Sequence, residues 1–521
     1  MDQNRLYYGD NLDVLRRYIP DQSIDLVYLD PPFNSHQDFN VLFAEQDGSR
    51  AAAQIKAFGD TWRWDQGSAS AYEEIVERGA EGVAQVLRAF RAFLGDSDMM
   101  AYLAMMAPRL VELHRALKTT GNIFLHCDPT ASHYLKLLLD GIFGPHNFRS
   151  EVIWERTTNT GSSKSKARRF ATDHDVLLYY AKDARRAFFR TQYRPYTEEY
   201  IRRYYTNDDG DGRGPYQVQA LKTCSAERRM KLEAQGRIVE GKGRYPRFKD
   251  YLRGKAGVPI NDMWIDIEPV NPAAKEKLGY PTQKPEALLE RIIESALPGG
   301  GVVLDPFCGC GTTIAAAQKL GRRWIGIDVT QVAISLIKNR LATAYAPGEV
   351  RFEVVGEPTT LPDAIALAHE DRFQFQYWAL GLVGARGTER KKGADHGIDG
   401  RLFFHDEPGG RSKQIIISVK SGHVGVKDIR ELSDVVRRER AQIGALLTLE
   451  SPTGPMRSAA AEGVYRSSWG VYPRLQILTI AELLGGNRIE FPWTSGANVT
   501  LKRAPRAMRP DSEVLDLLLD T

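Results

Sequence analysis

Cysteine is scarce in this chain, with four residues among 521. They are too irregularly placed for a disulfide framework, and no cysteine–histidine pair has the spacing of a structural zinc site. The sequence also lacks a signal-peptide pattern at its start and any apolar run as long as a membrane span. We therefore expect a cytoplasmic protein with no membrane partner, long enough for two or more domains without disulfides.

A strong net charge is missing as well, because 70 basic and 66 acidic side chains leave only +4. The distribution is uneven, however: residues 151–260 hold 24 Lys and Arg against 14 Asp and Glu, or +10, and the rest carries −6. Basic groups neutralise phosphates and aromatic rings stack on bases, so this segment is the predicted nucleic-acid surface, with a solvated charged face as the alternative. The predicted DNA contacts are Lys164, Lys166, Arg168, Arg169, Arg202 and Arg203.

Two short motifs each follow an apolar run that predicts a buried parallel strand, at residues 24–29 and 302–304. The first motif is Asp30-Pro31-Pro32-Phe33, and the second spans residues 305–313. Repeated strand–helix units around both runs predict a doubly wound α/β sheet. Ligands collect at the carboxyl ends of strands in such sheets, so we expect the two motifs to line one cleft.

The second motif has the features of a loop that binds a nucleoside-bearing cofactor. Gly309 and Gly311 let a ligand approach the backbone, and the helix that starts at Thr312 offers free N–H groups to a negative group. Asp328, which lies 23 residues after Asp305, can accept hydrogen bonds from ribose hydroxyls. The motif lacks both the Gly-Lys-Ser/Thr of a P-loop and the three-glycine dinucleotide fingerprint, which disfavours a Rossmann dehydrogenase.

The first motif suits chemistry on the exocyclic amine of a nucleobase. Asp30 and the carbonyl of Pro31, held by the rigid Pro-Pro backbone, can accept both amine hydrogens and draw the nitrogen toward sp³ geometry. Phe33 is expected to stack on a flipped-out base. Methyl transfer would then be an in-line displacement at a sulfonium. A turn that merely closes the strand is the alternative for this motif taken alone.

Together the motifs resemble the permuted β class of S-adenosylmethionine-dependent DNA amino-methyltransferases, over residues 1 to about 345. Residues 280–285 resemble the segment of this class that closes over the methionine moiety, and Gly9-Asp10 resembles its acidic dipeptide near the adenine. The resemblance implies a Rossmann-like methyltransferase fold, S-adenosylmethionine as the cofactor, and the first motif as the catalytic residues. The cofactor-binding residues that it implies are Asp10, Thr282, Lys284, Asp305, Phe307, Gly309, Gly311, Thr312, Thr313 and Asp328.

The resemblance also favours a target base. Asp as the first residue of the catalytic motif is usual for adenine-N6 enzymes, whereas cytosine-N4 enzymes more often carry Ser there, so adenine is favoured and cytosine stays open. Double-stranded DNA is the expected partner, and a homodimer stays open. A non-catalytic DNA-binding protein with a degenerate fold is disfavoured, because Asp30 and the glycine loop are both retained.

A second resemblance lies near the C-terminus, where Gly393–Gly400 and Ser418-Val419-Lys420 resemble Mrr-like restriction domains of the PD-(D/E)xK nuclease fold. Asp399, as a Mg²⁺ ligand, and Lys420 match two positions of that site. Ser418 stands where Glu or Gln is expected, and a hydroxyl is a poor ligand for a hard cation, so Glu370 or Asp395 would have to supply an oxygen. Nuclease activity and a domain that only binds DNA both stay open.

The predicted order of domains is a catalytic half at 1–150, a target-recognition region at 151–260, a cofactor-binding half at 261–345, a linker at 346–362, a restriction-like α/β domain at 363–492 and a tail at 493–521.

Overall fold

The computed structural model describes residues 3–32, 63–157, 170–239, 245–271, 273–280, 282–387, 397–407, 412–492, 500 and 504–507. The chain divides into two compact units, Arg190–Met263 and the remainder. Among the described residues, no helix combines the length and the apolar character that a membrane span requires.

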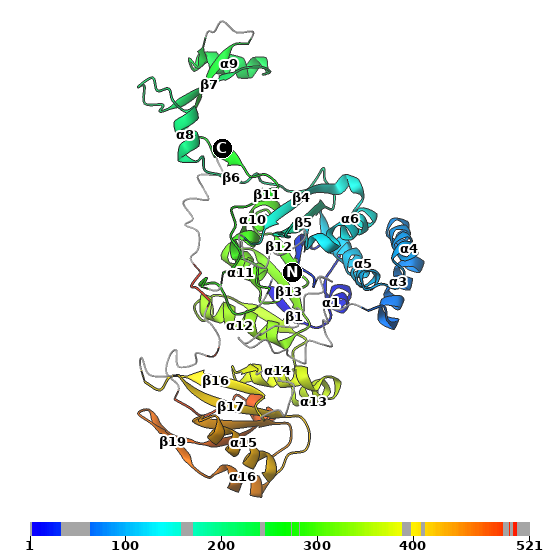
Figure 1. Cartoon of the computed structure of the whole chain (residues 1–521), viewed down its shortest axis with the longest axis vertical. Coiled ribbons are helices and arrows are strands. Elements are labelled where there is room, and N and C mark those ends of the chain that lie inside the picture. The colour runs from blue at the N-terminus through cyan, green and yellow to red at the C-terminus, as the bar shows by residue number, and fades with distance from the viewer. Residues whose placement is uncertain are drawn as a thin grey trace. The chain divides into compact units, whose positions relative to one another are not determined.

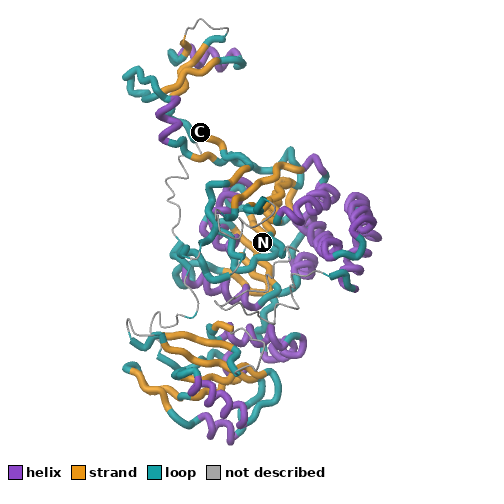
Figure 2. Tube along the Cα trace, viewed as in Figure 1, coloured by secondary structure: helices purple, strands orange, loops and turns teal. Residues whose placement is uncertain are grey.

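A nine-stranded sheet in the order β11-β4-β5-β3-β2-β12-β13-β1-β14 organises the larger unit (Figures 1 and 2). Strands β3, β2, β12, β13, β1 and β14 run parallel, whereas β5 is antiparallel to β3 and β4. Their bounds are β1 (Asn4–Tyr8), β2 (Ile24–Leu29), β3 (Leu117–Cys127), β4 (Phe148–Glu155), β5 (His174–Ala181), β11 (Met263–Trp264), β12 (Val302–Asp305), β13 (Arg323–Asp328) and β14 (Phe352–Val355). The runs at 24–29 and 302–304 are thus the parallel strands that their continuous apolar sequence predicts.

Helices cover both faces of this sheet, with α1 and α3 to α6 on one face and α10 to α12 on the other (Figure 1). Their bounds are α1 (Asn11–Tyr18), α3 (Gln66–Arg78), α4 (Glu81–Leu94), α5 (Asp98–Ala116), α6 (Pro129–Phe143), α10 (Glu286–Ala296), α11 (Thr312–Lys319) and α12 (Gln331–Ala344). Helical sequence at 72–93 forms two helices, α3 and α4. The break lies at Gly79, where a Cβ atom would be 2.4 Å from the carbonyl oxygen of Ile75.

Two segments differ from the predicted domain plan. Strand β5 lies within the predicted recognition region 151–260 and β4 extends into it, but both belong to the central sheet, and the other compact unit begins only at Arg190. The predicted linker 346–362 contains β14, which pairs with β1. Both differences follow from local sequence: β5 reads His-Asp-Val-Leu-Leu-Tyr-Tyr-Ala and is buried almost throughout, while β14 is a short edge strand with a weak apolar pattern.

The unit Arg190–Met263 holds a three-stranded antiparallel sheet, a short strand pair and two helices. A small core of Leu221, Leu232 and Phe248 joins the sheet to α9. Its elements are β6 (Tyr193–Arg194), α8 (Glu198–Tyr204), β7 (Tyr216–Ala220), α9 (Ala226–Ala234), β8 (Ile238–Val239), β9 (Arg247–Tyr251) and β10 (Val258–Pro259).

The C-terminal region is a separate α/β domain with a five-stranded sheet, β15-β16-β17-β18-β21, and its own apolar cores on the two faces. Its strands are β15 (Arg386–Gly387), β16 (Gly400–Phe404), β17 (Lys413–Lys420), β18 (Ile443–Thr448), β21 (Leu475–Thr479) and the hairpin β19 (Val464–Ser467) with β20 (Gly470–Pro473). Its helices are α13 (Leu361–Glu370), α14 (Arg372–Leu382), α15 (Val426–Arg438), α16 (Gly454–Ala460) and α17 (Ile480–Leu484).

Candidate active site

Neighbouring strands β2 and β12 bring the two sequence motifs to one edge of the sheet. The strands are parallel and in register, with Leu304 opposite Val27, so Asp30 and Asp305 both emerge at the carboxyl ends. The pKa of Asp305 reflects this proximity. Burial, and then the charge of Asp30, raise it to about 7. The expected shared edge is therefore present in the fold.

Asp30 forms an ion pair with Lys284, whose Nζ lies 2.5 Å from Asp30 Oδ2. Lys284 precedes α10 in the segment that the resemblance assigns to the cofactor, yet here its ammonium group contacts the carboxylate of the catalytic motif. Their side chains are only 14% and 19% exposed, which favours a firmly held pair. Pro31 and Pro32 follow Asp30 at the strand end, and Phe33 lies outside the described residues.

The loop between β12 and α11 has the backbone shape that its glycines predict. Gly309 and Gly311 adopt φ angles of +49° and +76°, and the Gly311 amide donates to the carbonyl of Cys308 at 2.7 Å. A Cβ atom on Gly311 would lie 2.6 Å from the side chain of Ile337, so larger residues are excluded by space as well as by φ. Thr312 and Thr313 are buried at the start of α11, and Phe307 packs partly buried against the main core.

Asp328 is tied to this loop from the end of β13. Its Oδ2 accepts from the Gly309 amide at 2.9 Å, and its Oδ1 accepts from the amide and hydroxyl of Thr330 at 2.9 and 2.7 Å. Burial raises the pKa of Asp328 to about 6 although these hydrogen bonds act in the opposite direction. A half-buried carboxylate beside a glycine loop suits the hydroxyl donors of a ribose.

A side chain that the sequence motifs do not include, Arg340 of α12, braces the same loop. Its Nη1 donates to the carbonyl of Cys310 at 3.1 Å, and its Nη2 lies 2.6 Å from Glu286 Oε1 at the start of α10. Arg340 is 2% exposed. The sequence signal that could have identified Arg340 is an arginine at helical spacing from apolar residues. A buried guanidinium needs hydrogen-bond acceptors, so such an arginine has partners elsewhere in the fold.

Asp10 is engaged by the protein itself. Its Oδ1 caps α1 through the Leu12 amide at 2.8 Å, and its Oδ2 accepts from Arg109 Nη2 at 2.8 Å. Arg109 also donates to Asn11, whose amide reaches the carbonyl of Pro306 at 2.9 Å. This second buried arginine, also missed from the sequence, therefore connects the start of α1 to the cofactor loop.

Two further residues lie on the segment before α10. Thr282 is half-buried. Tyr280 was not predicted from the sequence as a site residue, but its ring lies 3.4 Å from the position of a Cβ atom on Gly309 and so covers the glycine loop.

The predicted DNA contacts fall in two places. Lys164, Lys166, Arg168 and Arg169 lie outside the described residues. Arg202 and Arg203 are exposed on α8 of the unit Arg190–Met263, a helix with no buried side chain. The ring of Tyr200 on this helix stacks on Tyr196 at 5.1 Å, and Arg203 lies 5.5 Å from the ring of Tyr204. The helix thus presents exposed basic and aromatic side chains together.

The described nuclease-like residues of the C-terminal domain do not form a metal cluster. Asp399 Oδ2 accepts from the Val419 amide at 2.7 Å and from the Ser418 hydroxyl at 3.2 Å, and Lys420 lies 3.7 Å from Asp428. No group of three or more His, Cys, Asp or Glu side chains in the described part of the chain could hold a metal ion.

Neither proposed supplier of the missing oxygen is seen to provide it. Asp395 lies outside the described residues. Glu370 is the last residue of α13. The pKa of Tyr8 is raised first by burial, then by the charge of Asp371 and then by the charge of Glu370.

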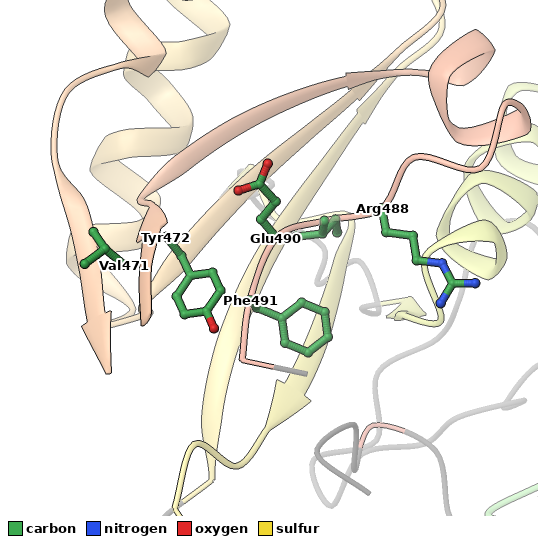
Figure 3. A pocket seen from close by; sticks show the side chains of 6 residues that line it. Val471, Tyr472, Arg488, Glu490 and Phe491 are labelled. Carbon is green, nitrogen blue, oxygen red and sulfur yellow. The ribbon is translucent and has the colours of Figure 1, made fainter. Parts of the chain in front are cut away.

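A hollow of about 360 Å³ opens on the C-terminal domain beside β20 (Figure 3). It is lined by Val471, Tyr472, Arg488, Ile489, Glu490 and Phe491. Figure 3 shows the Tyr472 and Phe491 rings side by side, while the charged ends of Arg488 and Glu490 point apart. This lining contains none of the predicted catalytic residues.

Two family models match different parts of the chain. Residues 24–339, more than half of the sequence, match the N6_N4_Mtase family, described as DNA methylase. Residues 373–484 match the family described as NACHT-associated inactive Restriction Endonuclease 1.

Two curated relatives illustrate the similarity. The type II methyltransferase M.EcaI of Enterobacter cloacae is 28% identical over 285 residues, which are 50% of this chain and 62% of the relative. The Mod subunit of the type III restriction-modification enzyme StyLTI of Salmonella typhimurium is 28% identical over 357 residues, 61% of this chain and 50% of that subunit. The chain thus matches only half to about three fifths of the length of these relatives.

Solved structures with a similar fold include the M1.HpyAVI–SAM complex, at 15% identity and a TM-score of 0.31, covering 65% of this chain and 99% of that one. The cytosine-N4-specific PvuII DNA methyltransferase has 14% identity and a TM-score of 0.32, covering 64% and 84%.

Proposed function

The chain belongs to the N6/N4 DNA methylase family, and from this we propose that it transfers a methyl group from S-adenosylmethionine to an exocyclic amine in double-stranded DNA, with adenine N6 as the favoured target. The observation that carries the proposal is the position of Asp30 at the same sheet edge as the glycine loop and Asp328. An amine acceptor and a nucleoside site are thereby neighbours.

The residues at the loop fit this cofactor. Gly309 and Gly311 leave backbone accessible, and the half-buried Asp328 can accept from ribose hydroxyls. S-adenosylmethionine, when bound, supplies an electrophilic methyl group on a sulfonium. Arg340 contributes by fixing the carbonyl of Cys310, and hence the loop.

Asp30 acts on the base. Lys284 holds one carboxylate oxygen, Oδ2, and the other oxygen is the one that would accept a hydrogen from the amine. An amine whose hydrogens are held by Asp30 and by the carbonyl of Pro31 has its lone pair turned toward the methyl donor, and this interaction strengthens as the nitrogen becomes tetrahedral. Cytosine N4 is the second candidate target, because the same acceptors can hold either amine.

The test is to incubate DNA with the protein and methyl-labelled S-adenosylmethionine, and then to digest the DNA to nucleosides. We expect the label on N6-methyladenine. Label only on N4-methylcytosine would overturn the choice of base, and no label in DNA with folded, cofactor-binding protein would overturn methyl transfer itself.

For the C-terminal domain we propose DNA binding without cleavage. Ser418 replaces an acidic metal ligand, and the carboxylate of Asp399 accepts hydrogen bonds from β17. A phosphodiesterase of this type needs enough carboxylate oxygen to hold Mg²⁺ and activate water.

A further inference from the structure

A chain of three buried polar side chains crosses the sheet beside Asp30. The hydroxyl of Tyr28 lies 2.8 Å from His126 Nδ1, and His126 Nε2 lies 3.1 Å from Asp175 Oδ2. These side chains come from the adjacent strands β2, β3 and β5 and are 2%, 0% and 4% exposed. Burying three such groups is costly unless they are paired, and here each has a hydrogen-bond partner among the other two.

Asp175 determines which nitrogen of His126 carries a hydrogen. Burial alone would raise the pKa of Asp175, but the hydrogen bond with His126 and the nearby positive charges lower it, so the carboxylate is ionised. An ionised carboxylate only accepts, so the ring hydrogen lies on Nε2. When His126 carries a single ring hydrogen, Nδ1 then accepts, and the hydroxyl hydrogen of Tyr28 points to His126.

The direction of this hydroxyl matters because Tyr28 lies two residues before Asp30 and faces the same side of the sheet. After burial, the charge of Asp30 is the largest influence that raises the pKa of Tyr28, so the phenol stays protonated beside the carboxylate. Lys284 holds Asp30 Oδ2. A phenol hydrogen that turned to the other oxygen would compete with the amine of the base for the same acceptor.

We propose that Tyr28, His126 and Asp175 form a positioning chain that keeps the Tyr28 hydroxyl turned away from Asp30 and so leaves the carboxylate open to the amine. The inference rests on the proposed methyl transfer and adds a device that controls its amine acceptor. His126 and Asp175 act through Tyr28 and are positioning residues.

The decisive variant is Asp175→Asn, because its amide can donate to Nε2 and move the ring hydrogen to Nδ1. Tyr28 then loses its acceptor and donates to Asp30. We expect the single-turnover rate of methyl transfer to fall about tenfold to a hundredfold, the equivalent of one hydrogen bond to a charged group, with unchanged affinity for S-adenosylmethionine. The double variant Tyr28→Phe/Asp175→Asn should recover most of the rate, because the competing hydroxyl is gone.

Two controls separate this role from general damage. Tyr28→Phe alone is the reference for the double variant, and the two rates should agree within about twofold. Tyr179→Phe removes a hydroxyl that is likewise buried in the sheet, 3.1 Å from Asn122 Oδ1, and it should neither slow the reaction nor rescue Asp175→Asn. A double variant as slow as Asp175→Asn, or an Asp175→Asn rate within about twofold of the wild type, would overturn the proposal.

A second measurement does not depend on activity. In protein labelled with ¹⁵N-histidine, the signal of His126, assigned by its loss in His126→Gln, should report hydrogen on Nε2 in the wild type and on Nδ1 in Asp175→Asn. Hydrogen on Nδ1 in the wild type would overturn the positioning chain. Failure of the proposed function has a different signature, which is wild-type protein that puts no label into DNA.

Discussion

At the scale of single residues, Asp30 and Asp328 are two carboxylates at one edge with different neighbours. Asp30 contacts the ammonium group of Lys284, whereas Asp328 accepts from the backbone of the glycine loop. Their surroundings therefore separate an acceptor for the base from an acceptor for the cofactor. Loss of each side chain should affect a different measured quantity.

Asp30→Ala should abolish methyl transfer and leave the affinity for S-adenosylmethionine nearly unchanged, because the role of Asp30 is confined to the amine. Asp328→Ala should weaken that affinity about tenfold or more, since hydrogen bonds to a half-buried carboxylate are removed. Calorimetric titration with the cofactor, beside a methylation assay, checks both. Equal loss of cofactor binding in the two variants would show that the roles are misassigned.

Asp305 leads to a prediction about stability. Burial raises its pKa to about 7, so the folded protein holds this proton more tightly than the unfolded chain. The resulting stabilisation is fully present below the ordinary pKa of an Asp and is lost as the pH rises through about 7. Asp305→Asn cannot ionise, so its melting temperature should gain on that of the wild type between pH 5 and pH 8.

Thermal melts of both proteins across this pH range measure the effect. Asp262→Asn, at an exposed position, is the matched control and should show no such trend. A difference in melting temperature that stays constant with pH would mean that Asp305 is ionised throughout the range.

At the scale of elements, the sequence was most informative where apolar runs or helical periodicity were long. Strand β2 forms at its predicted residues, because a fully buried strand leaves a strong apolar pattern. Short β14 and the break at Gly79 were missed, since edge pairing and one tight approach of backbone atoms leave little pattern.

The candidate site divides in the same way. The motifs gave Asp30, the glycine loop and Asp328, but not the braces Arg109 and Arg340, because a buried arginine is recognised only once its distant acceptors are known.

Arg340 allows the brace between α12 and the glycine loop to be tested. Arg340→Met leaves Glu286 and the carbonyl of Cys310 without this donor, and we expect a loss of about 3 kcal/mol in the free energy of unfolding and weaker cofactor binding. Lys338→Met is the control on the same helix: its ion pair with Glu357 is partly exposed, so the loss should stay below about 1 kcal/mol. Denaturant unfolding and cofactor titration measure both, and equal losses would argue against the brace.

At the scale of the whole molecule, the chain combines a methylase sheet, an inserted unit and a C-terminal domain that matches the family described as NACHT-associated inactive Restriction Endonuclease 1. Supercoiled plasmids, methylated and unmethylated, should stay intact when incubated with the protein and Mg²⁺, because no cluster of metal-ligating side chains forms around Asp399 in the described part of the chain. Gel electrophoresis would reveal nicking or linearisation. Mg²⁺-dependent cleavage that Asp399→Ala abolishes would refute binding without cleavage.

The inserted unit should contribute to DNA affinity through charge. Replacing Arg202 and Arg203 by Ser should weaken binding and reduce the salt dependence of log K by about 0.9 for each phosphate that is no longer neutralised. Titrations at several salt concentrations measure the slope. Glu198→Gln and Glu199→Gln on the same helix remove negative charge instead of positive charge. They are the control and should not reduce the salt dependence.

The insertion leaves the sheet after β5 and rejoins it at β11, and only β4 separates these two strands. Both of its ends therefore join the sheet at the β11-β4-β5 side, and neither β5 nor β11 carries Asp30 or Asp328. An insertion that begins and ends at strands outside the candidate site can be lengthened, shortened or exchanged between genes without disturbing the strands that carry Asp30 and Asp328. Natural variation in the insertion could then change what such a protein recognises, while the residues that carry its chemistry stay the same.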